Sequence, residues 1–427
     1  MFERIRWMIV ICLACVLGAP GCGDDDDDND DNDGTATDGD TDTEGAPLPF
    51  EALDVLFVVD NSASMTEEQA IFATSVFGLV NSLVEPLPTS PFAAADDVRV
   101  AVVSSDMGMQ WGGNPYEEGD GWPNDQLPCS AAGDDGQFQA YGSGKTIDLQ
   151  SGKIPCGQDA AQCPADWTCE NIGDDGVGVC TAPGVDGSDQ SCPSLETTWT
   201  ETPGEDGPNP EMAFQVACLS SLGTSGCGFE QQLQAAARGL TREDQQDFVR
   251  EDALLAVLVV SDEEDCSVES KELFLAPEIQ DLAATKVNIA CGENEQYLYS
   301  PTSFYQSFVD RKGGHASAVV FGAIVGVPVD DVCQGTGSEL AAAQCLQHEK
   351  MQLDPIEEQS SGMGITVYAP ACSRTEDGQE VTKARPARRI VELAQEFEGG
   401  GYVYSICNQD WTPAMREFAG IVLERME

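Results

Sequence analysis

The stretch that decides the fold runs from Leu53 to Met65 and reads LDVLFVVDNSASM. Its first half is a short, continuous apolar run rich in valine, which is typical of a central parallel strand buried on both faces. A polar loop, DNSASM, follows at once, and apolar residues then recur at helical spacing from Thr66 to about Val84. This part of the chain therefore predicts a strand, a tight loop and a helix, the repeating unit of a parallel α/β sheet.

Further segments of the same two kinds follow along the chain. Strands are predicted at residues 98–106, 253–262 and 401–406, and a further apolar run stands at residues 316–326. Helices are predicted at residues 230–240, 385–398 and 413–426. Because strands and helices alternate to the C-terminus, and the strands are apolar throughout, we expect an α/β fold with a doubly wound, mostly parallel sheet. We expect one domain, residues 50–427, that carries insertions.

Two insertions interrupt the α/β pattern. The first, at about residues 107–214, is rich in Gly, Asp and Pro and has too few apolar residues for a core of its own. It contains no C-x-x-C pair and no nearby His, so disulfides are favoured over zinc as its staples. Its six cysteines are Cys129, Cys156, Cys163, Cys169, Cys180 and Cys192. The second insertion, at about residues 328–386, is predicted to be irregular.

The N-terminus has the order of a secretory signal peptide. Arg4 and Arg6 precede an apolar run of eleven residues, Trp7–Leu17, which is too short for a bilayer that needs about 20. We expect the signal peptide to span residues 1–21. The junction before Cys22 resembles the lipobox of bacterial lipoproteins, which implies that Cys22 is lipidated and that the protein is exported and anchored in the cell envelope or at the cell surface. An ordinary secretory peptide is the alternative.

Residues 22–49 are acidic and hold no large apolar side chain before Leu48. Such a segment cannot bury enough surface to offset the entropy of ordering, so we expect a flexible tether. A calcium loop of the D-x-[DN]-x-[DN]-G type is the alternative at Asn29–Gly34. That loop needs a Glu in its twelfth position, where Asp40 stands, and two flanking helices that the pattern does not predict.

Charge and cysteine content narrow the function further. The chain has 20 Lys and Arg against 75 Asp and Glu, a net charge of −55, which excludes nucleic acid as a natural partner and suits a divalent cation or a basic ligand. Its 17 cysteines against two histidines favour disulfides and an oxidising compartment. Removing Cys12 and Cys15 with the signal and Cys22 with lipid leaves 17 − 2 − 1 = 14 cysteines, an even number. We expect all of these to be paired.

Oxygen-bearing side chains gather where the predicted strands end. Asp60, Ser62 and Ser64 form a D-x-S-x-S loop after the first strand, and Asp262 ends the strand at 253–262. Because binding sites of parallel sheets form at the carboxyl ends of strands, both aspartates should lie on one edge of the sheet. Carboxylates and hydroxyls are hard ligands that select Mg²⁺, Ca²⁺ or Mn²⁺.

The stretch VLFVVDNSASM resembles the metal-ion-dependent adhesion site of von Willebrand factor type A domains. The resemblance implies one divalent cation held by Asp60, Ser62, Ser64 and Asp262 together with a threonine of a second loop, best matched by Thr224, with Ser225 as its competitor. It also implies a protein partner whose acidic side chain fills an open coordination position of the metal. Where the family commonly has T-D-G, this chain reads SDEEDC. The added Glu263, Glu264 and Asp265 could hold a second cation, but we expect them to solvate the edge.

Other functional classes fit the residues less well. A phosphatase of the haloacid-dehalogenase type needs a second acid two residues after its nucleophilic Asp, and Ser62 occupies that place. A serine hydrolase of the α/β type needs a G-x-S-x-G elbow, which this chain lacks. We therefore expect no enzymatic activity, with a metal-dependent hydrolase as one alternative. The remaining alternative is a structural surface protein whose Cys-rich lobe does the binding while the metal site is vestigial.

Overall fold

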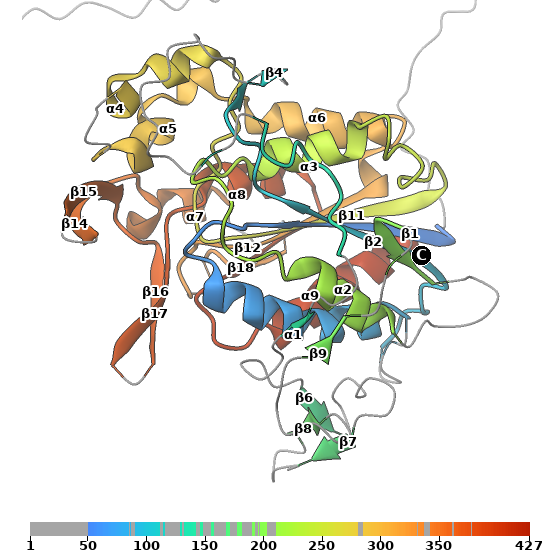
Figure 1. The fold of residues 1–427 in the computed structure, drawn as a ribbon. Helices are drawn as coiled ribbons and strands as arrows, with labels where there is room; N and C mark the ends of the chain where they lie inside the picture. The colour runs from blue at the N-terminus through green and yellow to red at the C-terminus, as the bar shows by residue number, and fades with distance from the viewer. Residues whose placement is uncertain are drawn as a thin grey trace, which may run out of the picture. The chain divides into compact units, whose positions relative to one another are not determined.

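The valine-rich runs form the centre of a seven-stranded sheet in the computed structural model (Figure 1). Five strands are parallel and one short antiparallel strand lies at each edge. In spatial order the strands are β10 (Trp199–Glu201), β2 (Asp97–Ser104), β1 (Ala52–Val59), β11 (Ala253–Ser261), β12 (Val319–Val325), β18 (Gly401–Ser405) and β13 (Gly335–Thr336). The predicted α/β class with a mostly parallel sheet is confirmed.

The structure describes most of the chain after the acidic segment. The predicted signal peptide (1–21), Cys22 and the predicted tether (22–49) lie outside the described residues, as does much of the first insertion. The described residues are 50–84, 86, 90–111, 114–115, 129, 132–141, 146–147, 155–157, 168–170, 177–181, 190–192, 195, 197–202, 211–280, 285–330, 332–336, 342–360, 363–376 and 378–427.

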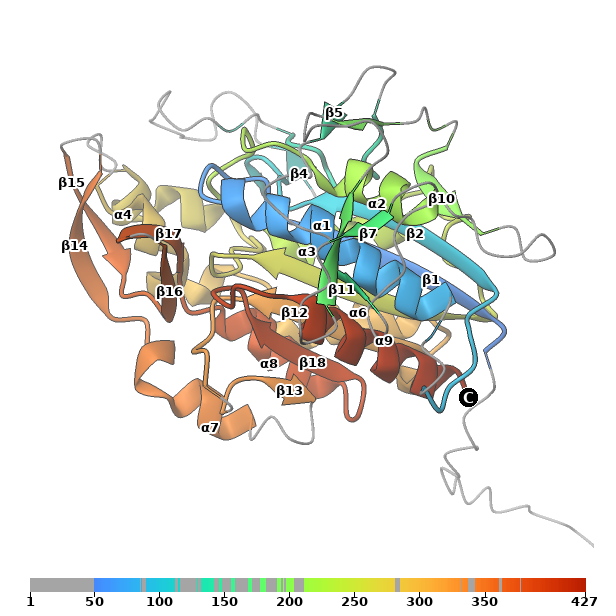
Figure 2. The same ribbon diagram turned by 90° about the horizontal axis from the view of Figure 1, so that it is seen from below.

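Helices cover both faces of the sheet (Figures 1 and 2). On one face lie α1 (Thr66–Val84), α2 (Met212–Ser220) and α9 (Thr412–Met426). On the other lie α3 (Gln232–Thr241), α6 (Pro301–Arg311) and α8 (Arg388–Glu396). None of the helices in the described residues is long and apolar enough to cross a membrane.

The two apolar layers are separated by the pleat of the strands. In β1, alternate residues such as Val55 and Phe57 face the layer of α1, while Leu56 and Val58 face the layer of α3. All eight residues of β1 and all nine of β11 are buried, and both strands are apolar except for Asp54, which pairs with Arg250, and Ser261 at the end of β11. Burial on two faces is what the sequence pattern indicates for them.

The spatial order of the strands reverses at β1. Six strands of this sheet follow one another along the chain as β1, β2, β10, β11, β12 and β18. When these are counted from 1 to 6 in that order, their spatial order is 3-2-1-4-5-6. In open α/β sheets of this order, ligands bind at the carboxyl ends of the strands where the order reverses, which here lies between β1 and β11. In the parallel register Val59 pairs with Val260 and with Ser104. The residues that follow these three strands are therefore neighbours.

Each insertion supplies one edge strand of the central sheet, β10 from the first and β13 from the second, and otherwise forms small sheets of its own. Within the first, β3 (Gln110–Trp111) pairs with β4 (Asn114–Pro115), and β5 (Thr146–Ile147) with β9 (Gln190–Ser191). A three-stranded sheet joins β6 (Pro155–Gly157), β8 (Val177–Thr181) and β7 (Thr168–Glu170). The second is more regular than predicted, with α7 (Ala342–Gln347) and the hairpins β14 (Pro355–Ser360)–β15 (Met363–Tyr368) and β16 (Cys372–Glu376)–β17 (Gln379–Ala384).

A third lobe, between β11 and β12, was not anticipated. It holds α4 (Pro277–Gln280) and α5 (Ala290–Glu293). Its small core includes Phe229, Phe274, Ile279, Val287 and Leu298. The same segment contains the 3-10 helices Lys271–Leu275, Val287–Ile289 and Glu295–Tyr297. Two more 3-10 helices, Ala316–Ala318 and Glu349–Met351, lie directly before β12 and in the second insertion.

Five disulfides join the described cysteines, which confirms the predicted disulfide chemistry. They are Cys129–Cys227, Cys192–Cys218, Cys266–Cys291, Cys333–Cys345 and Cys372–Cys407. The first two tie the Cys-rich insertion to the segment before α3 and to α2. The side chains of the four other predicted partners, Cys156, Cys163, Cys169 and Cys180, lie outside the described residues.

Candidate metal centre

Asp60 lies at the centre of the carboxyl edge of the sheet. It follows β1 directly, its backbone N–H donates to the carbonyl of Val260 at 2.9 Å, and its side chain is fully buried. One carboxylate oxygen accepts from the Ser62 N–H at 2.8 Å and the Ser105 hydroxyl at 3.2 Å. The other accepts from the Ser261 hydroxyl at 2.6 Å. The ends of β1, β2 and β11 thus converge on this one carboxylate.

A chain of hydroxyls connects the D-x-S-x-S loop to Asp262. The hydroxyl oxygens of Ser62 and Ser64 lie 3.1 Å apart, and the Ser64 hydroxyl donates to the Asp262 carboxylate at 3.1 Å. Asp262 and Ser62 are buried, while Ser64 is exposed. Four of the five predicted ligands therefore lie in one hydrogen-bonded group that opens to solvent at Ser64.

Thr224, the fifth predicted ligand, lies on a second loop, which is hydrogen-bonded to the D-x-S-x-S loop and to α1. The Gly226 N–H donates to the carbonyl of Asn61 at 2.8 Å, and Gly223 is bonded to the side chain of Gln69. Thr224 is half-buried and its competitor Ser225 is exposed. The structure therefore places the loop of Thr224 beside Asn61 and Gln69, and the Thr224 hydroxyl makes no hydrogen bond to the described residues.

Neither Asp60 nor Asp262 has a positively charged partner among the described residues. Burial raises the pKa of both carboxyls, and the charges of Glu263, Asp60 and Glu68 raise that of Asp262 further. Buried carboxylates are normally paired or bound to a metal. A cation at this edge would relieve both the desolvation and the mutual repulsion.

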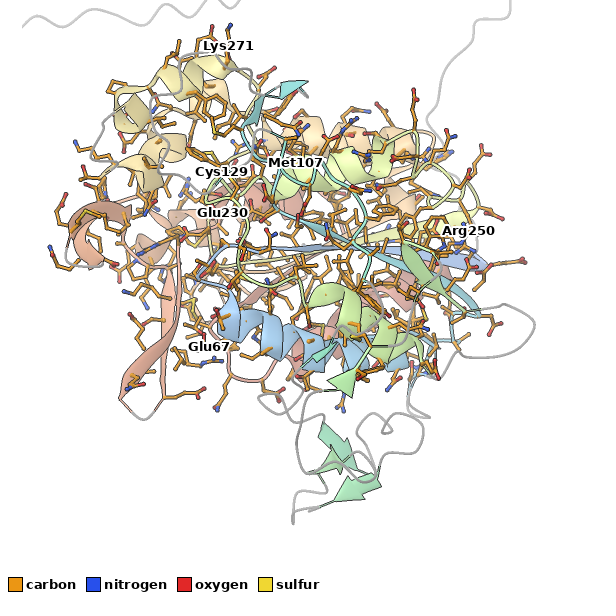
Figure 3. All side chains as sticks on the ribbon, in the orientation of Figure 1. Glu67, Met107, Cys129, Glu230, Arg250 and Lys271 are labelled. Atoms are coloured by element: carbon orange, nitrogen blue, oxygen red, sulfur yellow. A yellow bond between two sulfur atoms is a disulfide. The ribbon has the colours of Figure 1, made fainter. Side chains whose placement is uncertain are left out.

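Glu230 and Glu263 also lie near the two aspartates; the sequence pattern indicates Glu263 only as part of a possible second cation site and does not indicate Glu230. Burial and the charges of Asp60, Glu263 and Asp262 raise the pKa of Glu230, which precedes α3. Burial raises the pKa of Glu263 to about 7, against the attraction of the Arg385 guanidinium. Figure 3 shows Glu230 at the end of the sheet opposite Arg250. No motif marks Glu230 in the sequence, because contacts with distant segments hold it at this edge: its backbone bridges to Asp106 after β2 and accepts the N–H of Cys266 after β11 at 2.8 Å.

The chemistry of the donors fits a hard cation. Every candidate ligand offers oxygen, and a buried acceptor next to Asp60, Oδ1 of Asn61, has no hydrogen-bond partner in the described part of the chain. No three His, Cys, Asp or Glu side chains among the described residues are placed to hold a metal by themselves. A cation here would therefore depend on serine and threonine hydroxyls as well as on the two aspartates.

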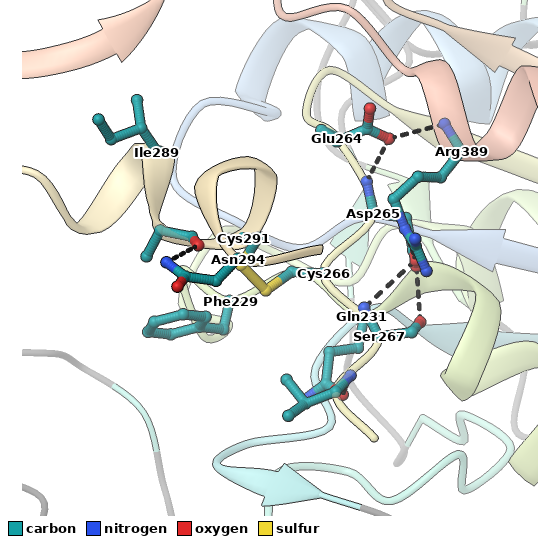
Figure 4. Close-up of a disulfide and its surroundings, with 12 residues drawn as sticks. Phe229, Gln231, Glu264, Asp265, Cys266, Ser267, Ile289, Cys291, Asn294 and Arg389 are labelled. Atoms are coloured by element: carbon teal, nitrogen blue, oxygen red, sulfur yellow. Dashed lines mark hydrogen bonds and ion pairs between the residues drawn. A yellow bond between two sulfur atoms is a disulfide. The ribbon is translucent and has the colours of Figure 1, made fainter. Parts of the chain in front are cut away.

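Glu264 and Asp265 have structural roles, contrary to the expectation that they solvate the edge (Figure 4). Glu264 accepts from the backbone N–H groups of Arg388 and Arg389 at 2.8 and 3.1 Å, at the first turn of α8. Asp265 is fully buried and pairs with Arg389 at 3.1 Å. It also accepts from the Leu233 N–H of α3 and from Ser267. The loop after β11 is therefore fastened to two helices.

Comparison of the chain with known protein families finds no match, and no curated protein matches it either. The fold and the geometry of this edge are therefore the grounds on which a function can be assigned.

Proposed function

We propose that the carboxyl edge between β1 and β11 binds one divalent cation, Mg²⁺, Ca²⁺ or Mn²⁺, through Asp60, Ser62, Ser64, Thr224 and Asp262. The observation that carries the proposal is the pair of buried aspartates on neighbouring strands, which has no positively charged partner in the described residues. The hydroxyl chain from Ser62 to Asp262 supplies further oxygen donors between them.

We propose further that the chain is a von Willebrand factor type A domain and acts in adhesion. The D-x-S-x-S loop stands between a central strand and the first helix, at the point where the strand order reverses. When bound, the cation supplies a Lewis-acidic position for an acidic side chain of a protein partner. The neutral Ser62, Ser64 and Thr224 leave more of its charge available to that side chain than carboxylates would, and Ser64 lies exposed where a partner can reach it.

Binding of the cation should stabilise the folded protein. A ligand that binds only the folded state adds RT ln(1 + [L]/Kd), about 2.7 kcal/mol at a hundredfold excess over Kd. We expect Tm to rise on addition of Mn²⁺ or Mg²⁺ to the metal-free protein and to return when EDTA is added. Differential scanning calorimetry at several Mn²⁺ concentrations checks this. A Tm that is independent of Mn²⁺ up to millimolar concentrations would contradict the proposal.

The location of the protein is part of the same proposal. We propose that a lipid on Cys22 anchors the exported protein in the cell envelope or at the cell surface and that residues 22–49 separate the domain from the membrane. Mass spectrometry of the N-terminal peptide from bacterial membranes should show a diacyl or triacyl mass on Cys22. Cys22→Ser should release the protein from the membrane fraction. An unmodified Cys22, or release of the unaltered protein, would show an ordinary secretory peptide instead.

A further inference from the structure

One side chain of α1 connects the two loops of the proposed metal site. Gln69 is 5% exposed, and its amide nitrogen donates to the carbonyl of Asp60 at 2.8 Å and to the carbonyl of Gly223 at 2.9 Å. Its amide oxygen accepts the N–H of Gly223 at 3.0 Å. The side chain thus pairs with both polar groups of Gly223, as a neighbouring strand would, while it also holds the backbone of Asp60.

The second loop is held at its other end as well. The Gly226 N–H donates to the carbonyl of Asn61 at 2.8 Å, and a Cβ added to Gly226 would lie 2.1 Å from Oδ1 of Asn61. Gly223 has a φ of +81°, which a residue with a Cβ adopts only with strain. The residues between the two attachments are Thr224 and Ser225, the two candidates for the ligand of this loop.

We propose that Gln69 is a positioning residue that holds the Thr224 loop against the Asp60 loop, so that the hydroxyl of Thr224 and the D-x-S-x-S oxygens can bind one cation together. This inference rests on the proposed function. Gln69 itself need not touch the metal, because its amide nitrogen and oxygen are already used by Asp60 and Gly223. It acts on the site through the backbone of both loops.

The physical argument is one of preorganisation. Without Gln69, the loop of Thr224 would keep the Gly226 attachment but lose both bonds at Gly223, and binding a cation would then have to restore its position. Loss of groups that orient metal ligands typically lowers metal affinity by about 10- to 100-fold. The loss should appear in affinity for the cation and not only in stability.

The chain offers a closely matched control in Gln245. This residue is also 5% exposed, and its amide donates to the carbonyls of Gly136 and Gly239 at 3.0 Å each and accepts the N–H of Phe138 at 2.7 Å. It makes the same three kinds of bond as Gln69 but contacts neither loop of the site. Gln245→Ala should therefore lower stability in a similar way and leave metal affinity unchanged.

The experiment compares the full chain carrying Gln69→Ala, Gln69→Met or Gln245→Ala with the unaltered protein. Mn²⁺ affinity is measured by electron paramagnetic resonance titration, and hydrogen exchange is measured for residues 221–228 without metal. We expect both Gln69 variants to weaken Mn²⁺ binding by 10- to 100-fold and to speed exchange in this loop, while Gln245→Ala does neither. Gln69→Met fills the same space without hydrogen bonds, and so it serves if the cavity left by alanine prevents folding.

The outcomes separate this inference from the proposed function. If the unaltered protein binds Mn²⁺ and the Gln69 variants bind it within threefold as tightly, the positioning role is overturned and the metal site stands. An equal loss of affinity in Gln245→Ala would also overturn it, because general stability would then explain the effect. If the unaltered protein binds no Mn²⁺, the proposed metal site and the role of Gln69 in it both fail.

Discussion

Asp60→Asn is expected to abolish the stabilisation of the protein by Mn²⁺, a loss of about 2.7 kcal/mol at a hundredfold excess of metal over Kd. The substitution keeps the shape of a fully buried side chain but removes the charge on which β1, β2 and β11 converge. Without metal, the variant loses the hydrogen bond from the Ser261 hydroxyl to Oδ2, but the removal of the buried charge should offset that loss, so that its stability falls less than that of Asp54→Asn. The reason is that it no longer buries a carboxylate without a cationic partner, near the like charge of Asp262. Chemical denaturation with Mn²⁺ and with EDTA measures both effects.

The matched control is Asp54→Asn on the same strand. Asp54 is also fully buried, but its carboxylate pairs with Arg250 at 2.8 Å towards the other end of β1. This variant should lose stability with and without metal and keep the Mn²⁺ response. If Asp60→Asn retained the response, the cation would bind elsewhere and the adhesion proposal would fail. If a protein partner were found and it still bound Asp60→Asn, the Cys-rich lobe would be the binding surface.

Asp265→Ala is expected to lower the free energy of unfolding by about 3–5 kcal/mol, because it leaves the buried Arg389 without its carboxylate. Arg389 is 7% exposed, and the other hydrogen bond of its guanidinium to the described residues is to the carbonyl of Tyr299. The substitution also removes the acceptor of the Leu233 N–H and of the Ser267 hydroxyl, at 3.0 and 2.7 Å. Urea denaturation with the disulfides intact measures the change.

An exposed ion pair supplies the control for Asp265. A guanidinium nitrogen of Arg242 lies 2.8 Å from a carboxylate oxygen of Asp244 at the surface, where solvent screens their attraction. Asp244→Ala should therefore leave the unfolding curve close to that of the unaltered protein. If Asp265→Ala cost less than about 1 kcal/mol, the ion pair with Arg389 would not fasten the loop after β11 to α8 and α3.

The local sequence pattern was sufficient to predict the central strands and the candidate metal ligands at their ends. The runs that form β1 and β11 are apolar except for Asp54 and Ser261, because helices cover both of their faces. Parallel strands bring their carboxyl ends to one edge, so Asp60 and Asp262 could be placed together from the chain alone. The lobe of α4 and α5 between β11 and β12 is not predicted, because these two helices are single turns, too short to show a helical period. The 11-residue helix α6 in the same segment is not predicted either.

Polar residues whose role depends on a distant partner could not be assigned in this way. Glu264 and Asp265 read as surface charges because they follow Asp262 in an acidic run, whereas Arg389, 124 residues away, makes Asp265 a buried anchor. Gln69 reads as an ordinary residue of a helix start, and its bonds to Gly223 span 154 residues. No spacing rule connects positions so far apart.

The amino-acid sequence by itself determined the α/β class, the parallel strands and the edge on which Asp60, Ser62, Ser64 and Asp262 stand, because periodicity and strand direction are local properties of the chain. Only the tertiary structure decided which acids surround that edge, how Asp265 is neutralised and how the Thr224 loop is held to the Asp60 loop. Those outcomes depend on burial and on hydrogen bonds between segments that meet only after the helices pack on both faces of the sheet. A charge or an amide acquires its role from that environment and not from its neighbours in the chain.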